Sequence, residues 1–474
     1  MAYRNDEHFC NNKLLLEAKD ASSLELVRLL FSSDIKNRRF IDCSEEHRDF
    51  NRRWLIFISV LLQRIVLSLR KPMAFTGQGI EMWLNMLSSN GGFFALLLNL
   101  LRGKLVKPDP KSSTFTSFVG NLDTRVELDK NIRVGHRRYI TSLSLMAAKL
   151  AYENEAFISS IIRDHWKMEF KGFYNFWNGY LEQPSTKAFM LQDSKSDPNL
   201  IVVAFRGTVP YDAYGWCTDI DLSWYELEGV GKIHRGFMEA LGLQKNGWPN
   251  DIDQGSDRSY AYYALRQTLK DILQKNEKAK LIVTGHSLGA ALAILFVSVL
   301  AIHEEAFLLD RLEGVYTFGQ PRVGDRQFGE FMKDKLKRYD VRYLRYVYSS
   351  DIVPRLPYDD KTLLFKHFGP CLFYNCFYKG KVMPEEPNRN YFSLWWFIPQ
   401  RFTAAWELVR SFIIPIINGR DYRETWLMTL MRMIGLAIPG LSAHCLQNYD
   451  NSARFGSLPL SVQLQDSHQE LHHD

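Results

Sequence analysis

From about residue 135 onward, short apolar runs alternate with longer segments of helical periodicity. The apolar runs are rich in valine, isoleucine and tyrosine, which indicates buried strands at 199–208, 280–284, 314–319 and 341–351. The longer segments predict helices at 139–162, 259–276 and 289–303. Strands that alternate with helices of this length predict an α/β fold, with a mostly parallel sheet covered by helices on both faces.

Residues 1–134 carry two apolar concentrations in place of this alternation, at 54–69 and 92–101. As a helix, the first would be about 24 Å long, which is short of the ~30 Å hydrocarbon thickness of a bilayer. A polar line runs along that helix through Arg52, Ser59, Gln63 and Arg70. A basic stripe on an otherwise apolar cylinder is typical of a helix that lies in a membrane interface.

Two arrangements of these apolar segments stay open. A hairpin that dips into one leaflet or into a lipid monolayer agrees with the basic residues that flank the segments. A pair of helices packed against the following domain is the alternative. Of the two, the sequence favours the first, so residues 1–134 are expected to form an N-terminal region that associates with lipid.

A long insertion, at about 362–438, is rich in aromatic side chains. Trp395, Trp396 and Phe397 stand next to Arg401, as in the aromatic belts found at membrane interfaces. Helices that close over the domain core would give the same pattern, and the sequence does not separate these alternatives. Residues 451–474 are polar and are expected to form a frayed tail.

The overall charge and the cysteines narrow the range of partners. A net charge of +6 over 474 residues suits contact with an anionic membrane surface, but it is too weak and dispersed to indicate nucleic acid. The cysteines include no CxxC pair and no metal-ligand spacing, so no metal site is expected. Because the N-terminus is polar and lacks a signal-peptide pattern, we expect free thiols and a location facing the cytosol.

Ser287, in VTGHSLGAALA, has the sequence context of a nucleophile. The pattern G-x-S-x-G is weak evidence alone, but here it follows a predicted strand and precedes an alanine-rich helix, as in a nucleophile elbow. Gly285 and Gly289 flank the serine, at positions where a side chain would collide with the neighbouring strand and helix. The N-terminus of that helix also points free N–H groups toward a developing negative charge.

A nucleophilic serine needs a base, and the base needs a carboxylate that orients it. Asp351 is the best acid, because it lies at the end of the strand-like run 341–351 and precedes a proline-stiffened loop. His444 is the best base, since it lies in a loop directly after the insertion, whereas His367 follows the aspartate too soon. His286 adjoins the nucleophile, and neighbouring side chains on a sharp elbow point apart.

Two backbone N–H groups are needed to stabilise the oxyanion of an ester hydrolase. One is expected from Leu288, the residue after the nucleophile. The other is expected from Thr208, at the end of an early strand, where Gly207 permits a close approach. The Thr208 hydroxyl could add a third hydrogen bond.

Several motifs occur in the order found in one family: AFRGT, WCTDIDLSW, IHRGF, VTGHSLGAALA, TFGQPRVGD, SSDIVPRLP and a late SAH. Over residues 135–450 the chain resembles the class 3, or fungal-type, triacylglycerol lipases, and its N-terminal region and insertion resemble the plant oil-body branch. The resemblance implies an α/β-hydrolase fold. It implies a triad of Ser287, Asp351 and His444 and an oxyanion hole of Thr208 and Leu288. One departure is the 93 positions between aspartate and histidine, which are close together in compact members.

The resemblance also implies a lid over the site, at about 209–219. Tyr211, Tyr214 and Trp216 make this segment amphipathic, so that it would open at a lipid–water interface and expose an acyl groove. An aromatic loop packed on the surface is the alternative.

The implied activity is hydrolysis of acylglycerol esters at the surface of a lipid droplet, through an acyl-enzyme and without a metal or an organic cofactor. The chain would lie on the cytosolic face of the oil body or of the endoplasmic reticulum membrane. A phospholipase A1 or a diacylglycerol lipase on the same scaffold is the alternative. A lipase-like signalling protein is disfavoured, because such regulators carry a large helical domain after the lipase core and only residues 445–474 follow His444.

Overall fold

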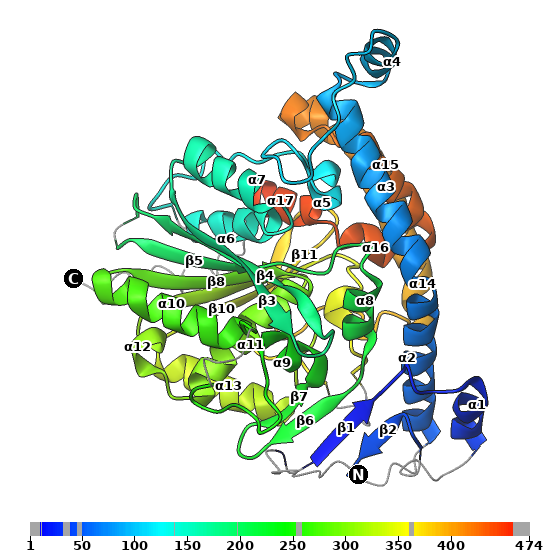
Figure 1. Cartoon of the computed structure of the whole chain (residues 1–474), viewed down its shortest axis with the longest axis vertical. Helices are drawn as coiled ribbons and strands as arrows, with labels where there is room; N and C mark the ends of the chain where they lie inside the picture. Colours follow the sequence, from blue (N-terminus) through cyan, green and yellow to red (C-terminus); the bar gives the residue numbers. More distant parts are fainter. Residues whose placement is uncertain are drawn as a thin grey trace.

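The computed structural model describes residues 10, 12–31, 38–44, 50–136, 138–196, 198–252, 258–359 and 365–457. At its centre is an eight-stranded sheet with the order β12-β11-β10-β9-β8-β5-β4-β3 (Figure 1). The strands are β3 (Glu169–Asn178), β4 (Gln183–Asp193), β5 (Leu200–Phe205), β8 (Lys280–His286), β9 (Leu312–Phe318), β10 (Arg342–Tyr348), β11 (Cys371–Tyr374) and β12 (Gly380–Met383). Pairing is parallel from β11 through β10, β9 and β8 to β5, and antiparallel at both edges.

Four of the parallel strands, β5, β8, β9 and β10, are the ones that the apolar runs predicted, whereas the parallel strand β11 was not predicted. Every residue of β5 is buried, and β8 is buried from Leu281 to His286, because helices cover both faces of the sheet. The predicted α/β fold with a mostly parallel sheet is therefore confirmed. The edge strands β3 and β4 were not predicted, since their sequences mix polar and apolar residues without regular alternation.

Helices lie on both faces of this sheet (Figure 1). One face carries α6 (Tyr139–Leu150), α7 (Glu155–Ser160) and α17 (Leu446–Phe455), and the other carries α9 (Arg235–Leu241), α10 (Ala261–Lys275), α11 (Leu288–Ile302), α12 (Ala306–Leu309) and α13 (Arg326–Arg338). α11 is buried from Gly289 to Ala301, which explains why its sequence is apolar on every side.

The single helix expected at 139–162 is interrupted. α6 ends at Leu150, and Asn154 begins α7 by accepting a hydrogen bond from the Phe157 N–H (2.9 Å). A π-helical turn, Ile161–His165, follows α7. The apolar periodicity continues through the break and therefore concealed it.

The N-terminal region is built into the domain through a second sheet with the order β2-β1-β6-β7. Its antiparallel strands are β1 (Asn12–Leu16), β2 (Ile41–Cys43), β6 (Trp224–Leu227) and β7 (Gly231–His234). A helix, α1 (Ser23–Phe31), follows β1 and lies at the same end of the molecule as this sheet (Figure 1). The boundary expected at residue 134 is thus not a structural boundary, because β1 pairs with β6 across more than two hundred positions of the chain.

The predicted apolar segments 54–69 and 92–101 lie in α2 (Phe50–Ser68) and α4 (Phe93–Leu101). A further helix, α3 (Arg70–Ser89), lies between them and continues α2 as a rod along one side of the domain (Figure 1). The two segments therefore do not form a hairpin. Within the described part of the chain no single helix is long and apolar enough to cross a membrane, and the pair α3 and α4, which together has the required length, bends by 79°.

The polar line of the first apolar segment faces inward, opposite to the expectation. Ser59 and Gln63 are buried, and the Ser59 hydroxyl donates to the Ile220 carbonyl (2.9 Å). The side chains that point outward from α2 include Leu62 and Ile65. The basic stripe does not form a solvated face along the whole helix, because its middle packs on the domain.

The insertion is helical only in its later part. β11 and β12 extend the main sheet, and the helices α14 (Leu394–Asn418), α15 (Trp426–Ala437) and α16 (Pro439–Ala443) follow. The tail expected from residue 451 begins inside α17, which ends at Phe455. Residues 458–474 of that tail lie outside the described residues.

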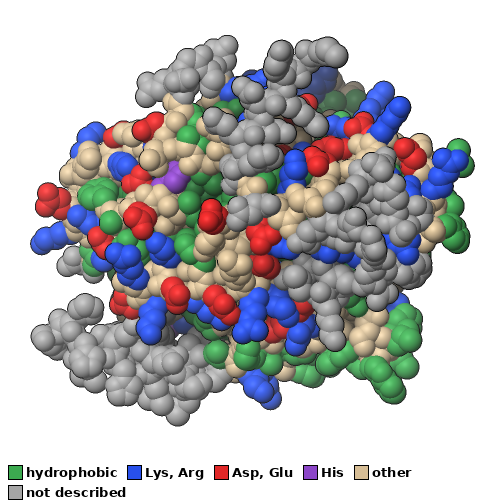
Figure 2. All heavy atoms as spheres, turned by 90° about the horizontal axis from the view of Figure 1, so that it is seen from below, with side chains coloured by type: hydrophobic (Ala, Val, Ile, Leu, Met, Phe, Trp, Pro, Cys, Tyr) green, Lys and Arg blue, Asp and Glu red, His purple; other side chains and the backbone are tan. Residues whose placement is uncertain are grey.

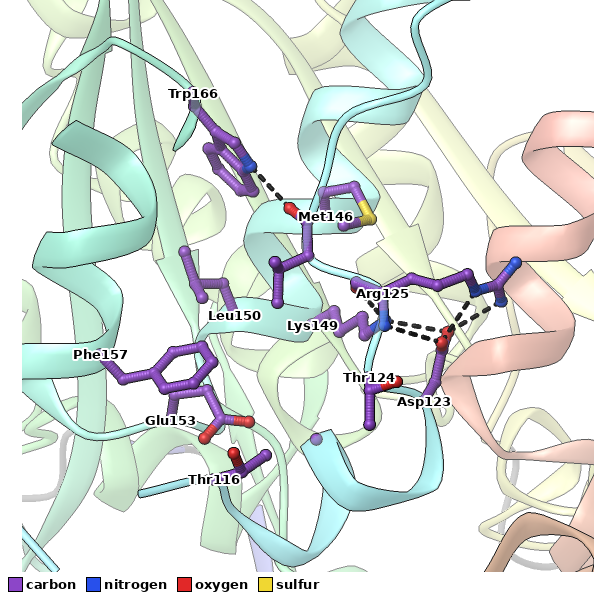
Figure 3. Close-up of a pocket in the computed structure, with 12 residues that line it drawn as sticks. Thr116, Asp123, Thr124, Arg125, Met146, Lys149, Leu150, Glu153, Phe157 and Trp166 are labelled. Carbon is purple, nitrogen blue, oxygen red and sulfur yellow. Dashed lines mark hydrogen bonds and ion pairs between the residues drawn. The ribbon is translucent and has the colours of Figure 1, made fainter. Parts of the chain in front are cut away.

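A buried ion-pair network fastens the segment after α4 to the main domain (Figure 3). The Asp123 carboxylate accepts from Arg125 (2.8 Å) and pairs with Lys149 of α6 (2.9 Å), and Arg125 also pairs with Asp450 of α17 (3.1 Å). Asp123, Arg125 and Lys149 line a cavity of about 60 Å³ together with Glu153. The paired charges around this cavity connect the segment after α4 to α6 and α17, which indicates a structural role.

Candidate active site

Ser287 lies where β8 meets α11, in the strand–turn–helix arrangement that the sequence predicted. Its backbone has φ 58° and ψ −131°, a strained conformation for a residue with a side chain. Its N–H donates to the Phe318 carbonyl at the end of β9 (3.0 Å), which fixes the turn against the next strand. A strained, fixed turn is what presents a hydroxyl at the edge of a parallel sheet.

The two flanking glycines allow this turn. A Cβ at Gly285 would collide with the backbone of Gly289, and a Cβ at Gly289 would collide with the carbonyl of Phe205 in β5. The predicted reason for both glycines, a close approach of strand and helix, therefore agrees with their contacts.

Asp351 and His444 meet although 93 positions separate them. Asp351 follows β10, and His444 follows the short helix α16. The Nδ1–H of His444 donates to both carboxylate oxygens, at 2.8 Å and 3.0 Å. Both side chains lie against Gly319, where a Cβ would be 2.9 Å from the His444 ring. Among the described residues no hydrogen bond joins the Ser287 hydroxyl to His444, as is common in hydrolases without substrate.

The Asp351 carboxylate is held by donors on several sides. The Val353 N–H donates to Oδ1 (2.9 Å), and the Tyr449 hydroxyl donates to Oδ2. Arg355 donates to the carbonyls of Asp351 and Ser349, so that the loop after β10 is fixed as well. Because the carboxylate is completely buried, these donors decide its orientation.

His286 packs against His444 and helps to hold it in place, a role that was not predicted from the sequence. The two rings stack with centroids 4.4 Å apart, and His286 Nε2 donates to the His444 carbonyl (3.0 Å). The Tyr152 hydroxyl of the α6–α7 connection donates to His286 Nδ1 (2.9 Å). Burial lowers the pKa of His286, so its ring is neutral and can both donate and accept. The exclusion of His286 as a base agrees with these contacts.

The predicted oxyanion residues lie on one cavity of about 20 Å³, which Thr208 and Leu288 line together with Asp212, Gly215 and Thr218. Within the described residues the backbone N–H groups of Thr208 and Leu288 donate no hydrogen bond, and both are available to a ligand. Thr208 follows β5, and Leu288 begins α11. Parallel neighbours in the sheet thus bring these residues together.

The Thr208 hydroxyl donates to Oδ2 of Asp219 (2.9 Å), so its proton is not free for the oxyanion in this arrangement. Burial raises the pKa of Asp219 to about 7, and Oδ1 of that carboxyl group is buried without a hydrogen-bond partner among the described residues. Asp219 was not singled out in the sequence, because WCTDIDLSW holds two aspartates and their burial cannot be predicted from local pattern.

Replacing Asp219 with asparagine is expected to change how stability depends on pH. The folded chain holds the Asp219 proton up to about pH 7, whereas the unfolded chain releases it near pH 3.8, the ordinary pKa of an aspartate side chain. The free energy of unfolding of the unmodified chain therefore falls across this window through Asp219, while asparagine does not titrate. Relative to the unmodified chain, Asp219→Asn should gain about 1–4 kcal/mol between pH 4 and pH 7.

Urea unfolding at pH 4, 5, 6, 7 and 8 measures this difference. Asp310→Asn, at an exposed position, is the control and should show no such gain. Glu153, whose pKa burial raises to about 7, is present in every variant and cancels in the comparison. A constant difference between Asp219→Asn and the unmodified chain at all five pH values contradicts the assignment.

The segment expected to form a lid folds as α8 (Ala213–Ile220), capped by Asp212. This helix packs against α2 and α3. The Tyr211 hydroxyl donates to Glu81 of α3 (2.8 Å), and a Cβ at Gly77 would collide with the Tyr211 ring. Tyr214 and Trp216 are half-buried. The N-terminal helices therefore hold the segment that covers the oxyanion cavity.

No group of three or more His, Cys, Asp or Glu side chains in the described ranges could hold a metal ion. The side chain of His367, a histidine that was set aside as the base, is buried, and its Nε2 bonds to the Pro354 carbonyl (2.6 Å).

Comparison with known proteins gives consistent matches. A family model described as "Lipase (class 3)" matches residues 202–361. The chain is 44% identical to "Triacylglycerol lipase OBL1" of Arabidopsis thaliana, with 91% of this chain and 90% of that protein covered. It is 42% identical to the protein of the same name from Nicotiana tabacum, with 86% and 84% covered. A solved structure, the native Rhizomucor miehei lipase propeptide complex, is 24% identical, covers 52% of this chain and 71% of its own, and has a TM-score of 0.38.

Proposed function

Because this chain belongs to the class 3 lipase family and is a carboxylic ester hydrolase, we propose that it hydrolyses triacylglycerols with Ser287 as the nucleophile. The hydrogen bond from His444 Nδ1 to Asp351 Oδ2 (2.8 Å), beside the strained turn of Ser287, supports this mechanism most. Identity to plant triacylglycerol lipases over about nine-tenths of both chains supports the substrate class.

In the proposed reaction, Ser287 Oγ attacks the ester carbonyl while His444 Nε2 accepts its proton. Asp351 keeps the other ring proton on Nδ1 and stabilises the imidazolium that forms. The N–H groups of Thr208 and Leu288 donate to the tetrahedral oxyanion. The glycerol oxygen leaves with the proton from His444, and a water molecule then hydrolyses the acyl-enzyme through the same groups, which releases a fatty acid.

Substrate access in this proposal requires movement of α8. The cavity lined by Thr208 and Leu288, about 20 Å³, has room for about one water molecule and none for an acyl chain. Tyr211, Tyr214 and Trp216 would be exposed when α8 moves, and a lipid surface would stabilise that state by taking up their rings.

The proposed location is the cytosolic face of a lipid droplet, where triacylglycerol is stored. The chain would bind there as a peripheral or monotopic protein. Apolar side chains that point outward from the N-terminal helices support this location. The endoplasmic reticulum membrane, where droplets arise, is the second location.

A substrate panel tests the proposed activity. Emulsified triolein, diolein and phosphatidylcholine are offered at equal surface area, and released fatty acid is titrated. We expect triolein to be hydrolysed at least about ten times faster than phosphatidylcholine, because the acyl groove and not a charged headgroup site would bind the substrate. A soluble short-chain ester reports that the active site is intact in the same preparation.

Faster hydrolysis of phosphatidylcholine would identify a phospholipase A1 instead, and faster hydrolysis of diolein a diacylglycerol lipase. If none of the lipids and no short-chain ester is hydrolysed, a signalling role without catalysis replaces the proposal.

A further inference from the structure

Helix α14 turns its polar side toward the protein and its apolar side outward. Glu407 and Arg410 are buried, and both contact the hydroxyl of Tyr348 at the end of β10 (2.9 Å and 3.0 Å). Trp395 and Ile416, in contrast, are 90% and 84% exposed. A helix on the surface of a protein in water has the opposite arrangement, with the apolar side against the core.

Helix α15 repeats this inversion. The Arg432 side chain is buried and pairs with Glu407 (3.1 Å) and Glu424 (2.8 Å), and it also donates to Asn448 of α17 (2.8 Å). On its other side Trp426 is 62% exposed. These buried ion pairs and hydrogen bonds hold the polar sides of both helices against the domain, so the inversion is a built feature of the fold.

The N-terminal rod has the same polarity. Asn85 of α3 is buried and forms two hydrogen bonds with the backbone of Thr116 (2.8 Å each), while Phe75 is 82% exposed and Trp83 is also exposed. In α2, Ser59 and Gln63 are the buried polar residues that face the domain.

These helices lie side by side although α3 and α15 are more than three hundred positions apart in the sequence (Figure 1). Leu84 of α3 packs in one apolar cluster with Leu427 and Met428 of α15 and Leu122 of α5 (Phe118–Leu122). We call the exposed apolar side chains of α2, α3, α14 and α15 the outer surface. Figure 2 shows the molecule from below, with charged side chains of both signs scattered over the face and hydrophobic side chains at the right-hand edge, the side on which α1 and these helices lie in Figure 1.

Basic side chains stand where these helices end. Arg70 and Lys71 are the first residues of α3, where it meets α2, and Arg420 and Arg423 lie between α14 and α15, all of them exposed. Arg401 stacks on the Phe397 ring, 3.5 Å from its centroid. Aromatic side chains flanked by arginine and lysine are complementary to an acyl layer under anionic headgroups.

We propose that the outer surface, composed of the N-terminal rod and the insertion before His444, docks the chain on the phospholipid monolayer of a neutral-lipid droplet. The inference rests on the proposed function for the identity of the lipid, and it assigns the helices that make the contact. The inner side of the same rod holds α8, so in the docked orientation the rod lies between the lipid and the segment that covers the oxyanion cavity. A second copy of this chain, the competing occupant, would not need basic side chains at both pairs of helix ends.

A flotation assay tests the surface, with triolein droplets coated with phosphatidylcholine and phosphatidylserine. The chain carries Ser287→Ala so that droplets are not consumed. One variant adds Trp395→Ser, Phe402→Ser and Ile416→Ser on α14, and another adds Phe75→Ser and Trp83→Ser on α3. The control adds Leu24→Ser, Val27→Ser and Phe31→Ser, which are exposed apolar positions on α1.

We expect each variant of the outer surface to reduce the bound fraction, the α14 variant by about 100-fold in affinity, and the α1 control to change it less than about threefold. With Ser287 restored, both variants should still hydrolyse a soluble short-chain ester at the unmodified rate, which shows that they fold. Unchanged droplet binding of the α14 variant overturns the proposal. So does a dimer in solution that the α14 changes dissociate while droplet binding persists. Failure of the substrate panel would not alter the binding result, because binding is measured without catalysis.

Discussion

Ser287→Ala is expected to lower kcat by about 10⁵–10⁶-fold on both emulsified triolein and a soluble short-chain ester. The hydroxyl is the only group at this position that can form the acyl-enzyme, and His444 and Asp351 have no function in that step without it. Folding should be unaffected, because alanine keeps the Cβ and the backbone bond from residue 287 to the Phe318 carbonyl. The melting temperature is therefore expected to stay within about two degrees of the unmodified value.

Ser298→Ala is the matched control for this substitution. Ser298 is a buried serine on α11, the helix that follows Ser287, and among the described residues its hydroxyl bonds only to the Leu295 carbonyl (2.7 Å). Its loss should leave kcat within about twofold, as expected for a residue away from the chemistry. If Ser287→Ala releases fatty acid at more than about a hundredth of the unmodified rate, a different residue is the nucleophile.

The elements that carry the candidate site could be predicted because their signals are local. β5 is a continuous apolar run and β8, β9 and β10 are mostly apolar, and such runs follow from burial on both faces of a parallel sheet. The turn around Ser287 has its own signal in two glycines that leave room for neighbouring backbone. The pairing of Asp351 with His444 was predicted from chain order and from the resemblance, since spacing alone gave no support.

The supporting contacts could not be predicted because each joins distant segments. Tyr152 reaches His286 across 134 positions, and Glu81 reaches Tyr211 across 130. Nothing in the sequence near Tyr152 or Glu81 marks these partners.

The sequence also did not predict which side of each surface helix packs against the protein. The hydrophobic pattern of α2 predicts two sides, but it does not say which side meets the protein. Ser59 and Gln63 were placed on the outer side by the usual rule for a helix at an interface, and the structure buries both. A chain that faces lipid reverses that rule, so the polar line becomes the packing side.

Asp351→Asn is expected to lower kcat by about 10⁴-fold while leaving the fold intact. The hydrogen bonds determine how the new amide sits. The Val353 N–H can only donate, so the amide oxygen takes the Oδ1 position that it contacts now (2.9 Å). The amide NH₂ then takes the Oδ2 position, where the Tyr449 hydroxyl can rotate to accept from it.

That NH₂ group also faces His444 Nδ1, at the 2.8 Å separation of the present carboxylate oxygen. It donates to Nδ1, so the ring proton moves to Nε2, and Nε2 can no longer accept the proton of Ser287. Tyr449→Phe is the comparison, because it removes one donor and keeps the carboxylate, and it should cost only about tenfold in kcat. Measured on a soluble ester, equal losses for the two variants would mean that Asp351 acts through packing and not through the tautomer of His444. If the loss in kcat for Asp351→Asn is at least about a hundred times the loss for Tyr449→Phe, the result supports the role of Asp351 in fixing the tautomer of His444.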